Sequence, residues 1–155
     1  MATLQTNYSA TISKGYPGFV PNAENANDIS RTVEDAAGIG FGVPVYRGTD
    51  DLGCTATVGT LASFYGWTKA TSAQPLTADR DADAYAQYDT ASIATHGPII
   101  IEVTGAVTDG APITVGTGAG AADGYGATAA DATHIATGWI ADETVTDGLC
   151  RIVKR

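Results

Sequence analysis

Positive charge and long apolar runs are both scarce in this sequence. Lys and Arg number 8 against 17 Asp and Glu, which gives a formal net charge of −9, and the one basic cluster is Arg151, Lys154 and Arg155. A phosphate backbone would be repelled over most of such a surface, so we expect no nucleic-acid partner. Residues 1–10 lack the basic and apolar regions of a signal peptide, and no window is apolar enough to cross a bilayer. We therefore expect synthesis in the cytoplasm and no membrane partner.

Cysteine is also rare, with Cys54 and Cys150 as the two examples. A cytosolic origin would keep both thiols reduced, and free cysteines are usually buried as small apolar side chains. We expect that role here, with a disulfide as the alternative. A zinc site needs three or four Cys or His ligands at short spacing, and neither Cys54 nor His96 has such a neighbour. No zinc site is expected.

Histidine is limited to His96 and His134, so few general bases are available for nucleophilic catalysis. No Gly-x-Ser-x-Gly elbow accompanies either residue. His96 precedes a Gly-Pro pair and His134 borders a Gly/Ala-rich stretch, which favours turn or surface positions for both. The glycines of residues 116–121 loosely match a dinucleotide fingerprint, but no βαβ pattern surrounds them. We expect neither catalytic residues nor a cofactor.

An acidic trio resembles the opening of a calcium-binding loop. Asp79, Asp81 and Asp83 have the right spacing, yet the sixth position is Ala84 and the twelfth is Thr90, where the loop requires glycine and a bidentate glutamate. The trio is therefore interpreted as a solvated loop. With no metal, cofactor or catalytic set in view, we expect that the protein is not an enzyme.

Glycine, alanine and threonine are abundant, and they favour strands and turns over helices. The clearest strand pattern alternates Ile99, Ile101 and Val103 on one face with Ile100, Glu102 and Thr104 on the other. Residues 135–141 and 149–153 are predicted to be the last two strands of the body. We predict an all-β fold, an antiparallel sandwich or jelly-roll-like body over residues 29–155. Its expected core residues are Trp67, Trp139, Ile99, Ile101, Val103, Ile135 and Ile152.

The connections are predicted from local chemistry. Residues 39–46 are expected to form the first strand of the body, and residues 49–53 a turn. Asp109-Gly110 is expected to form the tight turn of a hairpin within residues 107–115, between two extended runs. A second Val-Thr-Asp-Gly sequence occurs at 145–148 and hints at a similar hairpin. Residues 72–88 and 116–131 are predicted to be loops, and Ala91–Thr95 a short strand separated from Ile99–Val103 by Gly97-Pro98.

The first 28 residues are polar, with isolated apolar side chains that follow no helical or strand period. A frayed terminus is one interpretation. The other is an extended N-terminal arm that becomes ordered when its anchors meet grooves on a neighbour. These expected anchors are Leu4, Tyr8, Ile12, Tyr16 and Phe19.

Four segments together resemble the structural cement, or capsid decoration, proteins of tailed bacteriophages. The most specific is residues 29–43, Ile-Ser-Arg-Thr-Val-Glu-Asp-Ala-Ala-Gly-Ile-Gly-Phe-Gly-Val, followed by residues 88–93, 96–103 and 147–153. The resemblance implies a body on the outer surface of the capsid, at junctions between capsomers of the major capsid protein, which stabilises the shell. It also implies contacts with other copies of the protein, as a dimer or trimer, and adds Ile29 and Arg31 to the expected interaction residues.

Two other functions remain open on the sequence. A carbohydrate- or receptor-binding module could use Tyr65, Trp67, Tyr125 and Trp139 as a stacking platform, although such aromatic side chains are more often buried. A small hydrolase or lyase would depend on the two histidines and the acidic loop.

Overall fold

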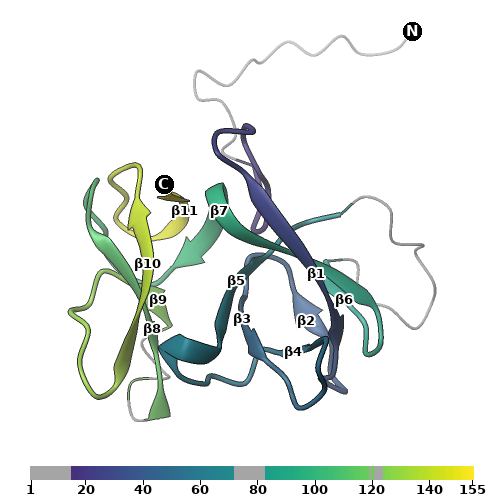
Figure 1. Cartoon of the computed structure of the whole chain (residues 1–155). Helices are drawn as coiled ribbons and strands as arrows, with labels where there is room; N and C mark the ends of the chain where they lie inside the picture. The colour runs from purple at the N-terminus through teal and green to yellow at the C-terminus, as the bar shows by residue number, and fades with distance from the viewer. Residues whose placement is uncertain (1–14, 72–82, 119, 121–123) are drawn as a thin grey trace, which may run out of the picture.

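The computed structural model describes residues 15–71, 83–118, 120 and 124–155, and almost all of its regular structure is strand (Figure 1). The all-β prediction is confirmed. The elements in chain order are β1 (Asn27–Val33), β2 (Ile39–Gly40), β3 (Pro44–Arg47), β4 (Gly53–Thr55), the 3-10 turn η1 (Leu61–Ser63), β5 (Phe64–Thr68), β6 (Ala84–Tyr85), β7 (Thr90–Val103), β8 (Pro112–Gly116), β9 (Tyr125–Gly126), β10 (His134–Ala141) and β11 (Gly148–Lys154).

Five strands form a closed ring. The sheet runs β1-β4-β3-β5-β7, and β7 pairs again with β1, so the ring has no free edge. The β1–β4 pair is parallel and the other four pairs are antiparallel. This pairing describes a small barrel-like sheet, and the predicted sandwich or jelly roll is not confirmed.

The same long strand, β7, belongs to a second sheet. Its first half pairs with β1 and β5, whereas residues Gly97 to Val103 pair with β11, and the order continues β11-β10-β8-β9. The Thr104 amide then donates to the Tyr125 carbonyl at 2.8 Å, which brings β9 back to the end of β7. Figure 1 shows β7 passing from the β1 side of the molecule to the β10–β11 side.

The prediction that Gly97-Pro98 separates two strands was wrong, because β7 continues through both residues. Ile100 turns its amide and carbonyl toward the segment at 18–19, away from β11. Pro98 lies two residues earlier and therefore has the same orientation, so its missing N–H removes no bond to β11. Gly97, at a φ of +91°, lets the backbone of residues 24–26 approach closely.

Two clusters of buried side chains fill the molecule. One lies under the second sheet and holds Trp67, Trp139 and the inward face of β7, and the other lies inside the first ring around Val45 and Ile93. Of the predicted core, Ile135 is half-buried, so that prediction was wrong, and the other six residues are buried. Cys54 and Cys150 form no disulfide and are both buried, one in each cluster, as expected. Burial raises the pKa of the Cys54 thiol to about 11.

The first part of the barrel differs from the sequence prediction. The first strand is β1, which precedes the expected one, and the expected strand over residues 39–46 is divided into β2 and β3 by a turn at Phe41-Gly42. Gly42 has a φ of +68° and donates its amide to the Thr68 carbonyl at 2.9 Å, which turns the chain at that point. The turn at residues 49–53 forms as predicted.

The expected hairpin at Asp109-Gly110 was also wrong. The turn itself forms, since the Ala111 amide donates to the Thr108 carbonyl at 2.9 Å. However, Val107 pairs with Val145, so the two Val-Thr-Asp-Gly sequences lie against each other, and β8 pairs with β10. The hairpin suggested by the second sequence does form, because β10 and β11 on either side of it pair antiparallel.

Both predicted loops contain a short strand. Residues 72–82 lie outside the described residues, but Ala84–Tyr85 forms β6 and pairs with β2. Within residues 116–131, Tyr125–Gly126 forms β9 and pairs with β8. The Tyr125 ring contacts Trp67 edge-on at 5.3 Å, which anchors this segment to the core.

Candidate protein-binding surfaces

The segment that leads into β1 is bound to the body by backbone hydrogen bonds. The Gly18 amide donates to the Ile100 carbonyl at 2.7 Å, and the Ile100 amide donates to the Phe19 carbonyl at 2.9 Å. On the other side, the Ala70 amide donates to the Gly18 carbonyl at 2.8 Å. The segment thus bridges β7 and the chain that follows β5.

Two glycines make this close approach possible. A Cβ on Gly18 would lie 2.7 Å from the Ala70 nitrogen, and a Cβ on Gly42 would lie 2.8 Å from the Gly18 nitrogen. Both glycines have positive φ, so any other residue would be strained as well as obstructed. At the far end of the segment, Glu24 forms an ion pair with Arg155 at 3.1 Å.

Tyr16 and Phe19 lie on this bound segment and form an aromatic pair. Their ring centroids are 5.5 Å apart, and the residues are 51% and 37% exposed. Because the backbone beneath them is fixed, the rings present apolar area to solvent with little conformational freedom left to lose. The two residues therefore form a preorganised contact surface.

The other predicted interaction residues are placed differently. Leu4, Tyr8 and Ile12 lie outside the described residues. Ile29 packs against the cluster inside the ring, and the Arg31 guanidinium lies over the Tyr65 ring, 4.9 Å from its centroid. Ile29 and Arg31 thus lie on the inward face of β1. The division at residue 28 stays a prediction, although Asn27 and Asp28 already belong to β1.

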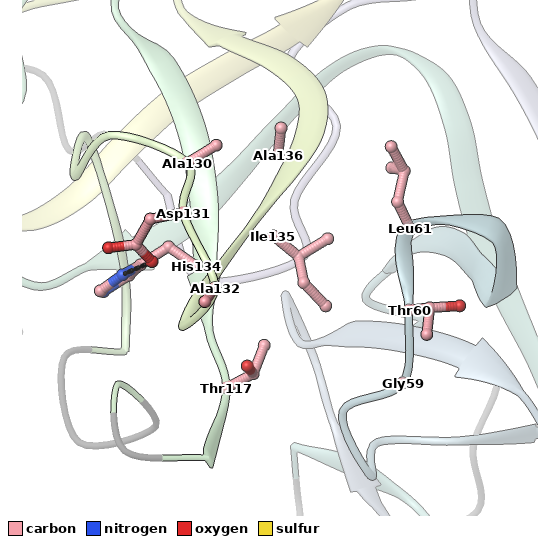
Figure 2. A pocket seen from close by; sticks show the side chains of 10 residues that line it. All are labelled: Gly59, Thr60, Leu61, Thr117, Ala130, Asp131, Ala132, His134, Ile135 and Ala136. Atoms are coloured by element: carbon pink, nitrogen blue, oxygen red, sulfur yellow. Dashed lines mark hydrogen bonds and ion pairs between the residues drawn. The ribbon is translucent and has the colours of Figure 1, made fainter.

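A groove of about 500 Å³ lies between η1 and the start of β10 (Figure 2). Leu61, which is 56% exposed, and Thr60 form one wall, and Ile135 and Ala136 lie opposite them. Its other lining residues are Gly59, Thr117, Ala130, Asp131, Ala132 and His134.

His134, which lines this groove beside Asp131, is buried, so the prediction of a turn or surface position was wrong for this residue. Asp131 holds the ring in place through its Oδ1 atom, 3.1 Å from His134 Nδ1. The same oxygen accepts the Thr133 amide at 2.7 Å and the Thr133 hydroxyl at 2.8 Å. These hydrogen bonds, the Thr133 amide first among them, lower the pKa of Asp131 to about 2.

The Asp131 carboxylate should stabilise the folded protein near neutral pH and lose this effect in acid. Its pKa in the folded protein is about 2, below its ordinary value of 3.8. The stabilisation is therefore fully present above pH 4 and is lost as the pH falls from about 4 to 2. Asp131→Asn should lower the unfolding midpoint at pH 5–7, and the difference from the natural protein should disappear by pH 2. Thermal melts across this range measure the effect, with Asp109→Asn as the control. A constant difference at every pH would contradict the assignment.

The stacking platform considered for carbohydrate binding does not form. Trp67 and Trp139 are fully buried, so they cannot present their faces beside Tyr65 and Tyr125. Within the described ranges, no three His, Cys, Asp or Glu side chains gather as a ligand set for a metal ion. Asp79 and Asp81 lie outside those ranges. None of the helices formed by the described residues is long and apolar enough to cross a membrane.

The described residues thus form a β-barrel-like body that carries a fixed surface segment with two exposed aromatic rings. The chain is a member of the phage structural cement protein family. The family model described as structural cement protein (E217 gp24/Pam3 gp6) matches residues 4–154. The resemblance found in the sequence is thereby confirmed, and the family places the protein in the virion, in association with the capsid shell.

A solved structure supports the fold. A chain of "The capsid of Myoviridae Phage XM1" is similar with a TM-score of 0.65 and 13% sequence identity, over 96% of this chain and 97% of that chain. No curated protein matches the sequence.

Proposed function

We propose that the protein binds the outer surface of the phage capsid at capsomer junctions, contacts the major capsid protein there, and stabilises the shell. It does so as a structural protein, without a cofactor or catalytic activity, after synthesis in the host cytoplasm. Copies of the protein contact one another on the shell as a dimer or trimer. The net charge of −9 supports the outer location, because an acidic protein is repelled by packaged DNA.

The observation that carries this proposal is the fixed segment with Tyr16 and Phe19. Residues 1–14, which include Leu4, Tyr8 and Ile12, precede in the chain a segment that is held on β7 by two backbone hydrogen bonds, and we propose that they act as an arm. An arm attached at a fixed point searches only a small volume, so its anchors act on a neighbour at high effective concentration. Repeated around an icosahedral shell, such contacts link capsomers.

The arm can be tested separately from the body. A chain that begins at residue 15 keeps the hydrogen bonds that join Gly18 to Ile100 and Ala70, so the body should still fold cooperatively, while its affinity for shells should fall at least about tenfold with the loss of three anchors. A deletion of residues 1–27 should also lower the unfolding midpoint, because the Gly18–Ile100 hydrogen bonds are lost. Cosedimentation with expanded shells that lack the protein measures affinity. Full affinity of the shorter chain would exclude a binding role for the arm.

Shell stability and location require the assembled particle. Shells that receive the full chain should melt at a higher temperature and survive a larger osmotic shock than bare shells. Unchanged shells would rule out the stabilising function. A cryo-EM map of the decorated particle should show the protein outside the shell at capsomer junctions, and density on the inner surface or at capsomer centres would contradict the proposed position.

A further inference from the structure

The turn between β6 and β7 carries an exposed tyrosine in a strained conformation. Tyr88 has a φ of +68° and is 77% exposed. In the described part of the chain, Asn25 is the one other residue besides glycine with positive φ, and asparagine tolerates that region. An aromatic residue there costs conformational free energy, and a ring in solvent recovers little of it from its own fold.

The backbone of this turn is held by hydrogen bonds to the end of β1. The Tyr88 amide donates to the Val33 carbonyl at 2.8 Å, and the Val33 amide donates to the Asp89 carbonyl at 2.9 Å. The Gln87 side-chain amide donates to the Glu34 carbonyl at 3.0 Å. These bonds to the end of β1 fix the strained conformation, so the ring projects in a set direction. Strain that is maintained in this way typically marks a functional position.

A second exposed apolar side chain lies on the other side of the same strand. Leu52 is 65% exposed, and its carbonyl accepts the Thr32 amide at 2.9 Å. Thr32 is also paired with Thr90 of β7, and both threonines are exposed. The backbones of Tyr88 and Leu52 therefore lie on opposite sides of the end of β1, next to the exposed Thr32 and Thr90. We call these four residues the Tyr88–Leu52 surface.

The charge beside this surface is mainly negative. Asp50 and Asp51 precede Leu52 in the same turn and are exposed. The Glu34 carboxylate stabilises that turn, because it accepts hydrogen bonds from the Thr49 and Asp50 amides at 2.8 and 2.9 Å. Arg47, which is exposed and paired across β3 and β4 with Cys54, is a cation near the same turn. A matching partner would therefore present an apolar pocket with basic side chains on its rim.

We propose that Tyr88 and Leu52 insert together into an apolar, basic-rimmed pocket on the major capsid protein. This inference rests on the proposed function and adds a docking point on the body, separate from the arm. Charge favours the shell over a second copy, because a twofold contact would place Asp50 and Asp51 of one copy against the same acidic turn of the other. The strain of Tyr88 is then offset by burial of its ring in the partner.

The decisive variant is Tyr88→Asn, tested in the full chain. Asparagine adopts positive φ more readily than tyrosine, so the unfolding midpoint should stay the same or rise, while affinity for bare expanded shells falls about tenfold or more. Leu52→Ser should weaken binding in the same direction, whereas Ile140→Ser, at an exposed apolar residue of β10 outside the candidate surfaces, serves as the control. Asp51→Lys should weaken binding, with Asp109→Lys as its control, and added salt should reduce the affinity of the natural chain.

The outcomes separate this inference from the proposed function. Natural affinity of the Tyr88→Asn and Leu52→Ser variants would overturn the docking point and leave the shell function intact. A parallel loss of unfolding midpoint and affinity in Tyr88→Asn would overturn it by assigning a structural role. Loss of self-association in analytical ultracentrifugation, with shell affinity unchanged, would assign the surface to a second copy. Failure of the natural chain to bind any shell would reject both proposals.

Discussion

Gly66→Ala should cost about 3 kcal/mol or more of unfolding free energy, as the sum of backbone strain and overpacking. Gly66 lies in β5 with a φ of +154°, and a Cβ there would overlap the carbonyl oxygen of Ala94 in β7. The obstacle is backbone in the adjacent strand, so no side-chain rotation can relieve it. Val45 pairs with Gly66 and Tyr46 with Phe64, which leaves Tyr65 as an extra residue in a bulge at this point of the ring.

The control for this variant is Gly110→Ala. Gly110 has a φ of +80°, but a Cβ added to it would meet nothing within 4 Å. It should therefore lose only the cost of the unfavourable backbone conformation, about 1 kcal/mol. Chemical denaturation of both variants measures the difference. Equal losses would mean that the β5–β7 contact is not a tight point of the barrel.

Trp67→Ala should lower the unfolding free energy by about 3–5 kcal/mol, and the melting temperature by about 10 °C or more. Trp67 belongs to β5 of the ring, yet its indole contacts Phe64 and Tyr125 edge-on and lies in the cluster under the second sheet. The side chain therefore couples the two sheets, and its removal should broaden the unfolding transition as well as shift it.

Trp67→Phe separates packing from polarity. The indole Nε1 is buried and has no hydrogen-bond partner among the described residues, so its loss leaves no acceptor unpaired. The smaller ring should retain much of the edge-on packing and cost clearly less than alanine. Differential scanning calorimetry compares the three proteins. A phenylalanine variant as unstable as the alanine variant would show that the indole N–H contributes a bond of its own.

Much of the core was predictable because local alternation marks a buried strand face. Ile99, Ile101 and Val103 alternate with Ile100, Glu102 and Thr104, and the structure buries the first three completely. The prediction that Ile135 belongs to the core was wrong because its side chain faces the groove at η1 and not the buried cluster. Alternation assigns a face to each residue, but it does not say whether another element covers that face.

The candidate contact surfaces were predictable only in part. Tyr16 and Phe19 stood out as apolar residues in a polar segment, and they form an exposed pair. Leu52 and Tyr88 are also apolar residues beside an aspartate, but the sequence places Leu52 in a predicted turn and Tyr88 at the end of a predicted loop, and neither position indicates a contact residue. The strain at Tyr88 depends on its φ, which no residue pattern specifies.

The sequence by itself determined the all-β class, the acidic surface and the strand faces, because composition and period 2 are local properties. The family resemblance was likewise present in residues 29–43. Only the tertiary structure decided that β1 closes the ring on β7, that Gly18 lies against Gly42, and that Val107 pairs with Val145. These contacts join residues far apart in the chain, so they are set by which backbone edges remain to be paired once the strands have formed.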